Sequence, residues 1–264
     1  MAADIVTQWN PAPDADLALA AEVYAGAGQP EPEPVEHAGQ PDPVGTASAR
    51  RDGELLSWAT VYSVDGGAWV ETLLASRLTR RLLAGTYDDV PPDADEVAAY
   101  KAMLGTAAEK AREAGHDSLR WAGQDTGPAG LAASALGAQT VEEIGRIWRA
   151  ETATWSRPFV VPEVEARPMP DGGVEAGPAR IHVDLGGTRA YVNAGEAIED
   201  GGLGAETLAG LVAALIEYIR EEHPRIAALT VFEFEDGEDA VIRRALGLAG
   251  LDVDARAQNF ELAL

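Results

Sequence analysis

Cysteine is absent from this 264-residue sequence, which excludes disulfides, thiolate metal sites and cysteine nucleophiles together. Basic residues are also scarce: 20 Lys and Arg stand against 44 Asp and Glu, which leaves a formal charge of −24 (20 − 44). Only Lys101 and Lys110 are lysines, and the first cationic side chain is Arg50. Nucleic-acid binding requires clustered basic residues to meet the phosphates, so no nucleic-acid partner is expected.

Long apolar runs are missing as well. No stretch of about 18 apolar residues could span a bilayer, and residues 1–6 lack the basic segment of a secretory signal. An anionic membrane surface would repel so acidic a chain. We therefore expect no membrane partner and a cytoplasmic location. The hydrophobic fraction of 46% is ordinary for a globular protein, and the length allows one large domain or two small ones.

Spacings typical of metal sites and of serine hydrolases do not occur. The four histidines are scattered without a His-x-x-x-His pair. The acidic run 233–239 lacks the glutamate that closes a calcium loop, and there is no Gly-x-Ser-x-Gly elbow. No metal is expected.

The N-terminal part predicts a helix, a loop, a meander of strands and a second helix. Residues 14–24 gather apolar side chains on one helical face. Residues 29–45 are acidic and rich in proline, which predicts a loop or mobile lid, or equally disorder. Residues 46–74 read as a three-stranded antiparallel meander with turns at Asp52-Gly53 and at residues 65–67. A broad apolar face predicts a helix over 95–114.

The remaining pattern is helix, strand, helix, strand, and it occurs twice. The first copy continues with a strand at 118–122, a helix at 129–136 and an extended run to 155, followed by a proline-rich linker at 158–173. The second copy has a hairpin at 179–185 and 188–194, a helix at 205–222, a strand at 226–234, a helix at 238–246 and a strand at 251–262. At an offset of 110 residues the two Leu-Gly pairs, 136–137 and 246–247, coincide, which indicates an internal duplication.

This order of elements, with the two joints Ala135-Leu-Gly-Ala138 and Ala245-Leu-Gly-Leu248, resembles the GNAT family of N-acetyltransferases as a divergent tandem member. Neither joint carries the aromatic residue usual in the family. The resemblance implies an α+β fold with two GNAT-like halves, each a mixed, largely antiparallel sheet crossed by helices. The implied domains are residues 1–150, with a degenerate cofactor loop, and 151–264, a shorter GNAT-like domain.

The resemblance also implies where acetyl-CoA would bind. The family holds the cofactor's pyrophosphate on a glycine-rich loop before the long helix, where backbone N–H groups and the positive helix end meet the phosphates. In the first half that place is 90–97, which has no glycine or basic residue and three acids, Asp93, Asp95 and Glu96; ordinary helix caps also explain them. In the second half Gly202, Leu203, Gly204 and Ala205 have the family's spacing, although a flexible glycine-rich helix cap explains them equally.

Two literal matches to the cofactor pattern, 124–129 and 244–249, lie beside the short helices and are interpreted as accidental. The resemblance further implies a base for the amine and a tyrosine acid for the leaving thiolate. Glu71, on the last meander strand, is the candidate base, with a surface carboxylate as the alternative. Neither short helix contains a tyrosine.

Two hypotheses follow. The first is an N-acetyltransferase that transfers an acetyl group from acetyl-CoA to a small or cationic amine, which the acidic surface would attract. The second is a catalytically inactive GNAT-fold pseudoenzyme that binds or regulates a protein partner.

Overall fold

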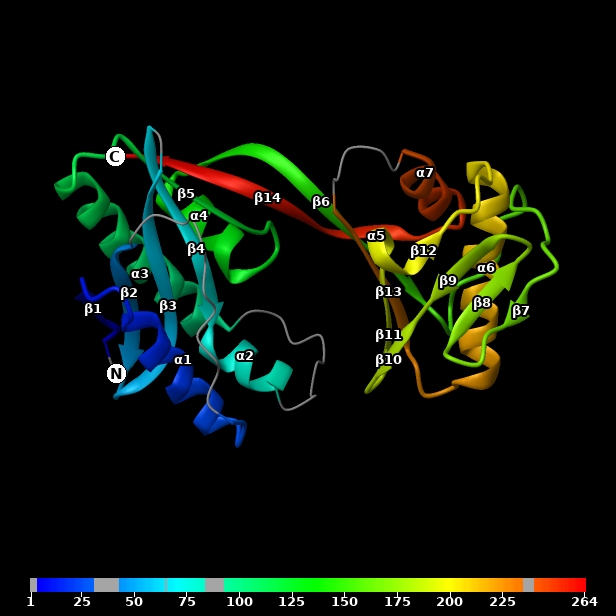
Figure 1. The fold of residues 1–264 in the computed structure, drawn as a ribbon, viewed down its shortest axis with the longest axis horizontal. Helices are drawn as coiled ribbons and strands as arrows, with labels where there is room; N and C mark the ends of the chain where they lie inside the picture. The colour runs from blue at the N-terminus through cyan, green and yellow to red at the C-terminus, as the bar shows by residue number, and fades with distance from the viewer. Residues whose placement is uncertain (1–3, 31–42, 65, 84–92, 235–239) are drawn as a thin grey trace. The chain divides into compact units, whose positions relative to one another are not determined.

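The computed structural model describes residues 4–30, 43–64, 66–83, 93–234 and 240–264, which form two compact units (Figure 1). Unit 1 comprises Met1–Glu143 with Gln258–Leu264, and unit 2 comprises Ile144–Ala257. The boundaries fall inside strands β6 (Gln139–Glu151) and β14 (Asp252–Ala263). The predicted assignment of domains to 1–150 and 151–264 stays a prediction. Most of the proline-rich segment 29–45 lies outside the described residues.

Unit 1 is built on an antiparallel meander that continues into a parallel pair of strands. Its strands are β1 (Val6–Asn10), β2 (Pro43–Arg51), β3 (Glu54–Val64), β4 (Gly67–Ala75) and β5 (Ser118–Gln124). β1 to β4 pair antiparallel in order, and β5 pairs parallel with β4. Asp52 and Gly53 have φ of 51° and 84°, as a two-residue hairpin turn requires. The predicted meander of β2, β3 and β4 is confirmed, and the sequence analysis missed β1.

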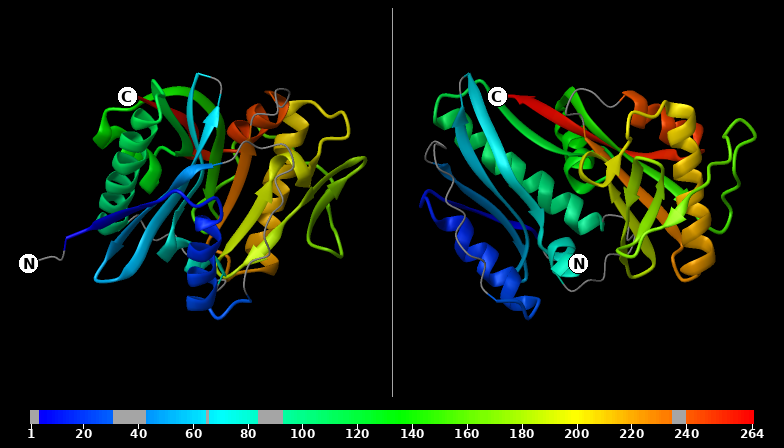
Figure 2. Two further views of the ribbon diagram at one scale, coloured as in Figure 1. Left: turned by 60° about the vertical axis from the view of Figure 1, so that its left-hand side comes forward. Right: turned by 45° about the vertical axis from the view of Figure 1, so that its right-hand side comes forward.

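The helices of unit 1 are α1 (Ala15–Gly26), α2 (Ser76–Leu83), α3 (Ala94–Glu113) and α4 (Pro128–Leu136). α3 buries Met103, Leu104 and a series of alanines in the core that also contains Trp121 of β5. α1 instead packs Val23 against Leu55 and Trp58 in a separate cluster. Both helices can be followed in Figure 2. α2 was not predicted.

Unit 2 contains two sheets around one long helix. One sheet carries β6, β13 (Ala228–Phe234), β11 (Arg189–Asn193) and β10 (Asp184–Gly186), and the other carries β12 (Ile198–Glu199), β9 (Ala179–His182), β8 (Gly173–Ala176) and β7 (Arg167–Pro168). The helices are α5 (Ala194–Ala197), α6 (Ala205–Glu222) and α7 (Ala240–Leu248). Ten residues of α6 are buried, so the helix is the centre of the core.

The hairpin predicted from residues 179–185 and 188–194 is wrong in its first arm. β9 pairs with β8, and only β10 pairs with β11. The reason lies at Gly173, where an added Cβ would stand 2.0 Å from the carbonyl oxygen of Ile181. A glycine there lets β8 approach β9 closely enough to pair, and β9 leaves the hairpin for the second sheet.

The order helix, strand, helix, strand occurs in both parts of the chain, as α3–β5–α4–β6 and as α6–β13–α7–β14. α4 ends at Leu136, and its C-cap residue Gly137 has a φ of 78°, the left-handed conformation common at this position. α7 includes its own Leu-Gly pair and continues to Leu248, two residues beyond the predicted end. The long helix α6 begins and ends at the predicted residues.

Candidate functional site

The parallel strands of unit 1, β4 and β5, separate partway along β4. β4 pairs with β5 only from Ala68 to Val70, although β4 continues to Ala75. A β-bulge lies at the point of separation, because Thr72 pairs with Thr60 and Val70 pairs with Val61 of β3. The residue between them is Glu71. A bulge re-aims the side chain of its extra residue and is frequent next to active sites.

Glu71 is exposed and lies within electrostatic reach of a phenol on the neighbouring strand. Tyr62 of β3 is half-buried and stands opposite Trp69 of β4 in the strand register. Burial raises the pKa of Tyr62, and the negative charges of Asp16 and Glu71 raise this pKa further. The structure therefore brings two carboxylates and two half-buried aromatic rings into one region of unit 1.

Tyr62 was not predicted, because the acidic tyrosine was expected in the short helices and not on a strand. The available signal was strand alternation, which puts Trp58, Thr60 and Tyr62 on one face of β3. The proximity of Glu71 to Tyr62 could not be predicted in the same way, because the bulge at Glu71 depends on the register between β3 and β4.

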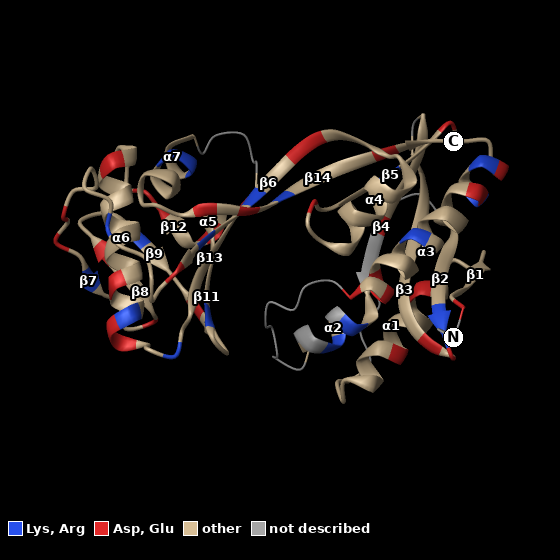
Figure 3. Cartoon of the chain, turned by 180° about the vertical axis from the view of Figure 1, so that it is seen from behind, with Lys and Arg blue, Asp and Glu red and all other residues tan. Residues whose placement is uncertain are grey.

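The first turn of α3 is occupied by its own carboxylates. The Asp93 carboxylate accepts a hydrogen bond from the backbone N–H of Asp95 at 2.9 Å, and the Asp93 N–H donates to Glu96 Oε2 at 3.1 Å. This is a capping box. Arg77 of α2 pairs with Asp93 at 3.1 Å, and Arg51 pairs with Asp95. Figure 3 shows the basic residues on α2. Residues 90–92 of the loop lie outside the described residues.

The first turn of α6 differs, because no side chain of the described residues caps it. The Asp200 carboxylate accepts a hydrogen bond from the N–H of Gly202, at 2.9 Å, and the N-cap residue is Gly204, which has no side chain to cap the helix. An added Cβ at Gly202 would meet no atom within 4 Å, and one at Gly204 would meet only Glu206 Oε2, at 3.8 Å. The N–H of Leu203 donates to the carbonyl oxygen of Asp200 at 3.0 Å. Open space therefore coincides with the backbone donors of Gly204 and Ala205 at this helix end.

A cation lies beside the same helix end. Arg244 of α7 donates to Glu206 of α6 at 2.8 Å. Both side chains are mostly exposed, at 67% and 59%, so this ion pair is weak and exchangeable. The neighbouring loop residue Leu203 packs on the core, and Ala205 is buried. The sequence match at 244–249 is no loop: its residues to Leu248 belong to α7.

The parallel pair of unit 2 remains closed. β11 pairs with β13 over its whole length, from Arg189 opposite Ala228 to Asn193 opposite Phe232, and α5 begins at the next residue. Glu71 belongs to unit 1 and the Gly202–Ala205 loop to unit 2. Among the described residues, the parallel pair that separates is the pair of β4 and β5 in unit 1. Among the described residues no group of three His, Asp or Glu side chains is arranged to hold a metal ion. No helix in that part of the chain is long and apolar enough to cross a membrane.

The structure is similar to a GNAT-family acetyltransferase from Colwellia psychrerythraea, with a TM-score of 0.50, 9% identity, and coverage of 98% of this chain and 99% of that chain. It is also similar to a tandem GNAT protein from the clavulanic acid biosynthesis pathway (TM-score 0.45, 15% identity, 98% of both chains). A third is a GCN5-related N-acetyltransferase from Sphaerobacter thermophilus (TM-score 0.41, 12% identity, 98% of this chain and 95% of that chain). No protein-family model and no curated protein matches the chain.

The likeness to the Colwellia psychrerythraea protein shows the fold. The chain has the fold of the GNAT acetyltransferases, and the predicted α+β tandem GNAT-like fold class is confirmed.

Proposed function

We propose that this protein is an N-acetyltransferase that transfers an acetyl group from acetyl-CoA to the amine of a small or cationic substrate. The fold supports the general activity. The observation that carries the proposal is the contrast between the two long helices. Asp93 and Glu96 cap the first turn of α3, whereas within the described part of the chain no side chain caps the first turn of α6.

The cofactor would bind at the start of α6. Pyrophosphate oxygens accept hydrogen bonds from free N–H groups, and the positive end of the helix dipole favours their charge. Within the loop Gly202, Leu203, Gly204 and Ala205, the N–H groups of Gly204 and Ala205 would meet the phosphates, because those of Gly202 and Leu203 already donate to Asp200. Arg244 would supply the cation that the loop lacks, by exchanging Glu206 for a phosphate. The negative charge of Asp200 repels the phosphates, so removal of that charge would strengthen the binding of acetyl-CoA.

Acetyl-CoA supplies the acetyl group as a thioester. In unit 1, Glu71 stays the predicted base, which would accept a proton from an amine bound where β4 separates from β5. The phenol of Tyr62 is protonated at neutral pH, and burial with the charges of Asp16 and Glu71 raises its pKa, so the phenol can donate a hydrogen bond to a bound substrate. An ammonium substrate is favoured here because Asp16 and Glu71 carry negative charge, and because Tyr62 and Trp69 offer aromatic faces.

The second candidate is a catalytically inactive GNAT-fold protein that binds or regulates a protein partner. Two observations favour it: the capping box at α3, and the closed pair of β11 and β13 in unit 2. It predicts that acetyl-CoA does not bind.

Calorimetric titration with acetyl-CoA distinguishes the acetyltransferase from the inactive protein. The acetyltransferase should bind one acetyl-CoA per chain, and Gly204→Val should abolish binding. The backbone of Gly204, at φ −72° and ψ 160°, suits valine, so the substitution should cost only about 1 kcal/mol of folding free energy through the weaker N-cap. Gly105→Val, on the open side of α3, is the matched control and should leave binding unchanged.

A variant that removes a charge from the same loop should raise the affinity for acetyl-CoA instead of lowering it. Asp200→Asn should tighten acetyl-CoA binding, because one repelling charge is removed from the loop. Equal affinity in the parent protein, Gly204→Val and Asp200→Asn would refute the location of the site. Absence of binding by the parent protein would favour the inactive candidate.

A further inference from the structure

Unit 2 presents two apolar side chains to solvent at the tip of one turn. The N–H of Val161 donates to the carbonyl oxygen of Pro158 at 3.0 Å, which closes a β-turn with Phe159 and Val160 at its centre. Phe159 is fully exposed and Val160 is 70% exposed, although aromatic and branched apolar side chains gain most from burial. We call residues 158–161 the apolar turn.

The chain is fixed to the core of unit 2 on both sides of the apolar tip. Before the tip, Trp155 is buried and its Nε1 donates to the carbonyl oxygen of Ala249 at 2.8 Å. After the tip, Val161 is buried in the core. Arg157 joins the two sides by donating to the carbonyl oxygen of Pro162 at 3.0 Å. A turn held in this way loses little conformational entropy when its tip is bound by a partner.

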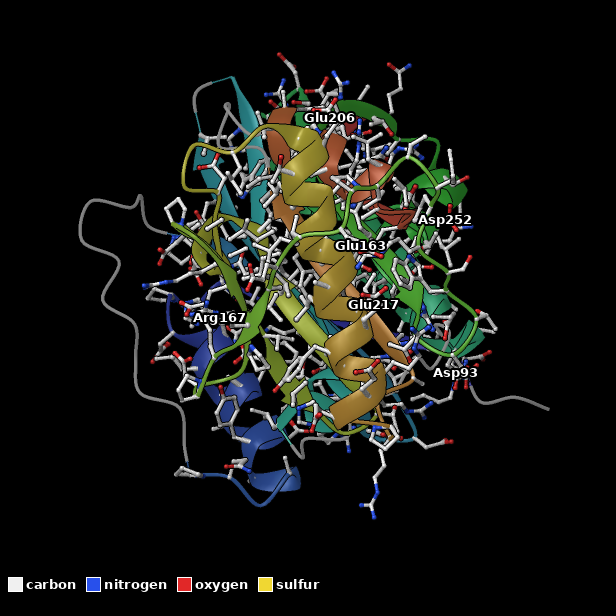
Figure 4. All side chains as sticks on the ribbon, turned by 90° about the vertical axis from the view of Figure 1, so that its right-hand side faces the viewer. Asp93, Glu163, Arg167, Glu206, Glu217 and Asp252 are labelled. Atoms are coloured by element: carbon white, nitrogen blue, oxygen red, sulfur yellow. The ribbon has the colours of Figure 1, made fainter. Side chains whose placement is uncertain are left out.

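A hollow of about 390 Å³ lies beside the apolar turn in the same unit. The apolar part of its lining comprises Ala150, Trp155, Gly250 and Val253. The turn and the hollow adjoin, because a Cβ added to Gly250 would stand 3.1 Å from the Cγ atom of Pro158. Figure 4 labels Asp252, also in the lining, and Glu163, two residues beyond the apolar turn.

Charged side chains complete the lining of the hollow. They are Arg149, Glu151, Asp252 and Asp254, with a formal charge of −2 (1 − 3). Arg149 pairs with Glu151 at 2.5 Å and with Asp254 at 4.0 Å. Its guanidinium can attract the face of an aromatic ring that enters the hollow. The negative balance repels an anionic lipid surface, which disfavours a membrane as the partner of the apolar turn.

A second copy of this chain fits a projecting apolar turn with a hollow next to it. Two copies related by a two-fold axis can each insert the turn into the hollow of the other, and this contact closes after two copies. A phenylalanine buries about 200 Å². Two tips and the walls that they cover therefore bury on the order of 1,000 Å², close to the smallest area that a specific interface needs. A weak dimer is expected.

We propose that the apolar turn and the adjoining hollow form a two-fold dimer interface, in which Phe159 of each copy enters the hollow of the other. The interface lies within unit 2 and does not depend on acetyl transfer. Each chain carries a formal charge of −24, so the two copies repel one another and salt should strengthen the dimer by screening that repulsion.

The test is sedimentation equilibrium of the full chain over a range of concentrations, at low and at high salt. The parent protein should dimerise, and more tightly at high salt. Phe159→Ala should raise the dissociation constant by about tenfold or more, because each dimer loses two buried rings. Phe234→Ala is the matched control. Phe234 is 50% exposed at the far end of β13, opposite Gly145 of β6, so its removal should leave the dissociation constant unchanged.

A substitution in the hollow tests the other side of the contact. Thr154 is exposed and lines the hollow, so Thr154→Trp should fill the space and weaken the dimer while the fold is retained. A mixture of Phe159→Ala and Thr154→Trp still combines one intact turn with one open hollow. The mixture should therefore associate more tightly than either variant alone.

A parent protein that stays monomeric at every concentration would overturn the proposal. Equal dissociation constants for the parent protein and Phe159→Ala would also overturn it, as would equal losses in Phe159→Ala and Phe234→Ala. If the monomeric parent protein floats with phosphatidylcholine vesicles and Phe159→Ala does not, the apolar turn binds a membrane surface and the dimer is refuted.

Discussion

A buried carboxylate in unit 2 permits a quantitative prediction. Glu233 of β13 is 2% exposed, and its oxygens accept hydrogen bonds from Trp148 Nε1 at 3.0 Å and from Arg243 Nε and Nη2 at 2.8 and 2.5 Å. Arg243→Met retains the aliphatic stem but removes the cation. The Glu233 carboxylate then remains buried, and among its hydrogen-bond donors named above only the indole N–H of Trp148 is left.

Removing one partner of a buried ion pair costs about 3–5 kcal/mol. Because the Arg243 side chain is 30% exposed, water can reach the vacated position, and we expect the lower end, about 3 kcal/mol. Adding Glu233→Gln removes the stranded charge, while the amide oxygen still accepts from Trp148. The double variant should therefore be more stable than Arg243→Met alone by about 1–2 kcal/mol.

Urea unfolding followed by circular dichroism measures these differences. The control is Arg244→Met, on the same helix, whose ion pair with Glu206 is exposed and should contribute less than about 1 kcal/mol. The reasoning is refuted if the double variant is less stable than Arg243→Met, since the stranded charge would then not be the source of the loss.

Two further predictions concern a buried tyrosine of α3 and a glycine of α6. Burial, with the charge of Glu96, raises the pKa of Tyr100 far above its ordinary value of 10.0. Above pH 10 the unfolded chain loses this proton while the native protein keeps it, so the free energy of unfolding should fall as the pH rises. Urea titrations at several pH values should show a shallower fall for Tyr100→Phe. Gly210→Ala places a Cβ 2.7 Å from the carbonyl oxygen of Pro162 and should lower the free energy of unfolding by about 1–2 kcal/mol. Gly105→Ala, in open space on α3, should raise the free energy of unfolding by about 0.5–1 kcal/mol. Equal shifts of the unfolding temperature in the two alanine variants would contradict the packing argument.

Local chemistry explains which elements were predictable. The bounds of α6 agree with the prediction because an uninterrupted apolar pattern begins after Gly204, and because the pattern stops before Pro224. β1 and α2 were missed. Five residues of alternating exposure in β1, and a short basic helix in α2, give too little periodicity to be recognised alone.

The candidate site depended much more on contacts between distant parts of the chain. The glycine spacing at 202–204 and the acids at 93–96 could be read directly. The proximity of Arg244 to the start of α6 could not, since it depends on how α7 packs against α6. The same holds for Tyr62 and Glu71, which depend on a bulge in the register between β3 and β4.

The sequence by itself therefore determined the charge, the alternation of helices and strands, the recurrence of their order and the residues able to cap each helix, because these follow from local propensity and spacing. Only the tertiary structure decided which helix end is occupied and which is free, where a parallel pair opens, and which carboxylates are balanced by arginines. Those outcomes depend on pairing register and side-chain packing between residues far apart in the chain, which no local pattern specifies.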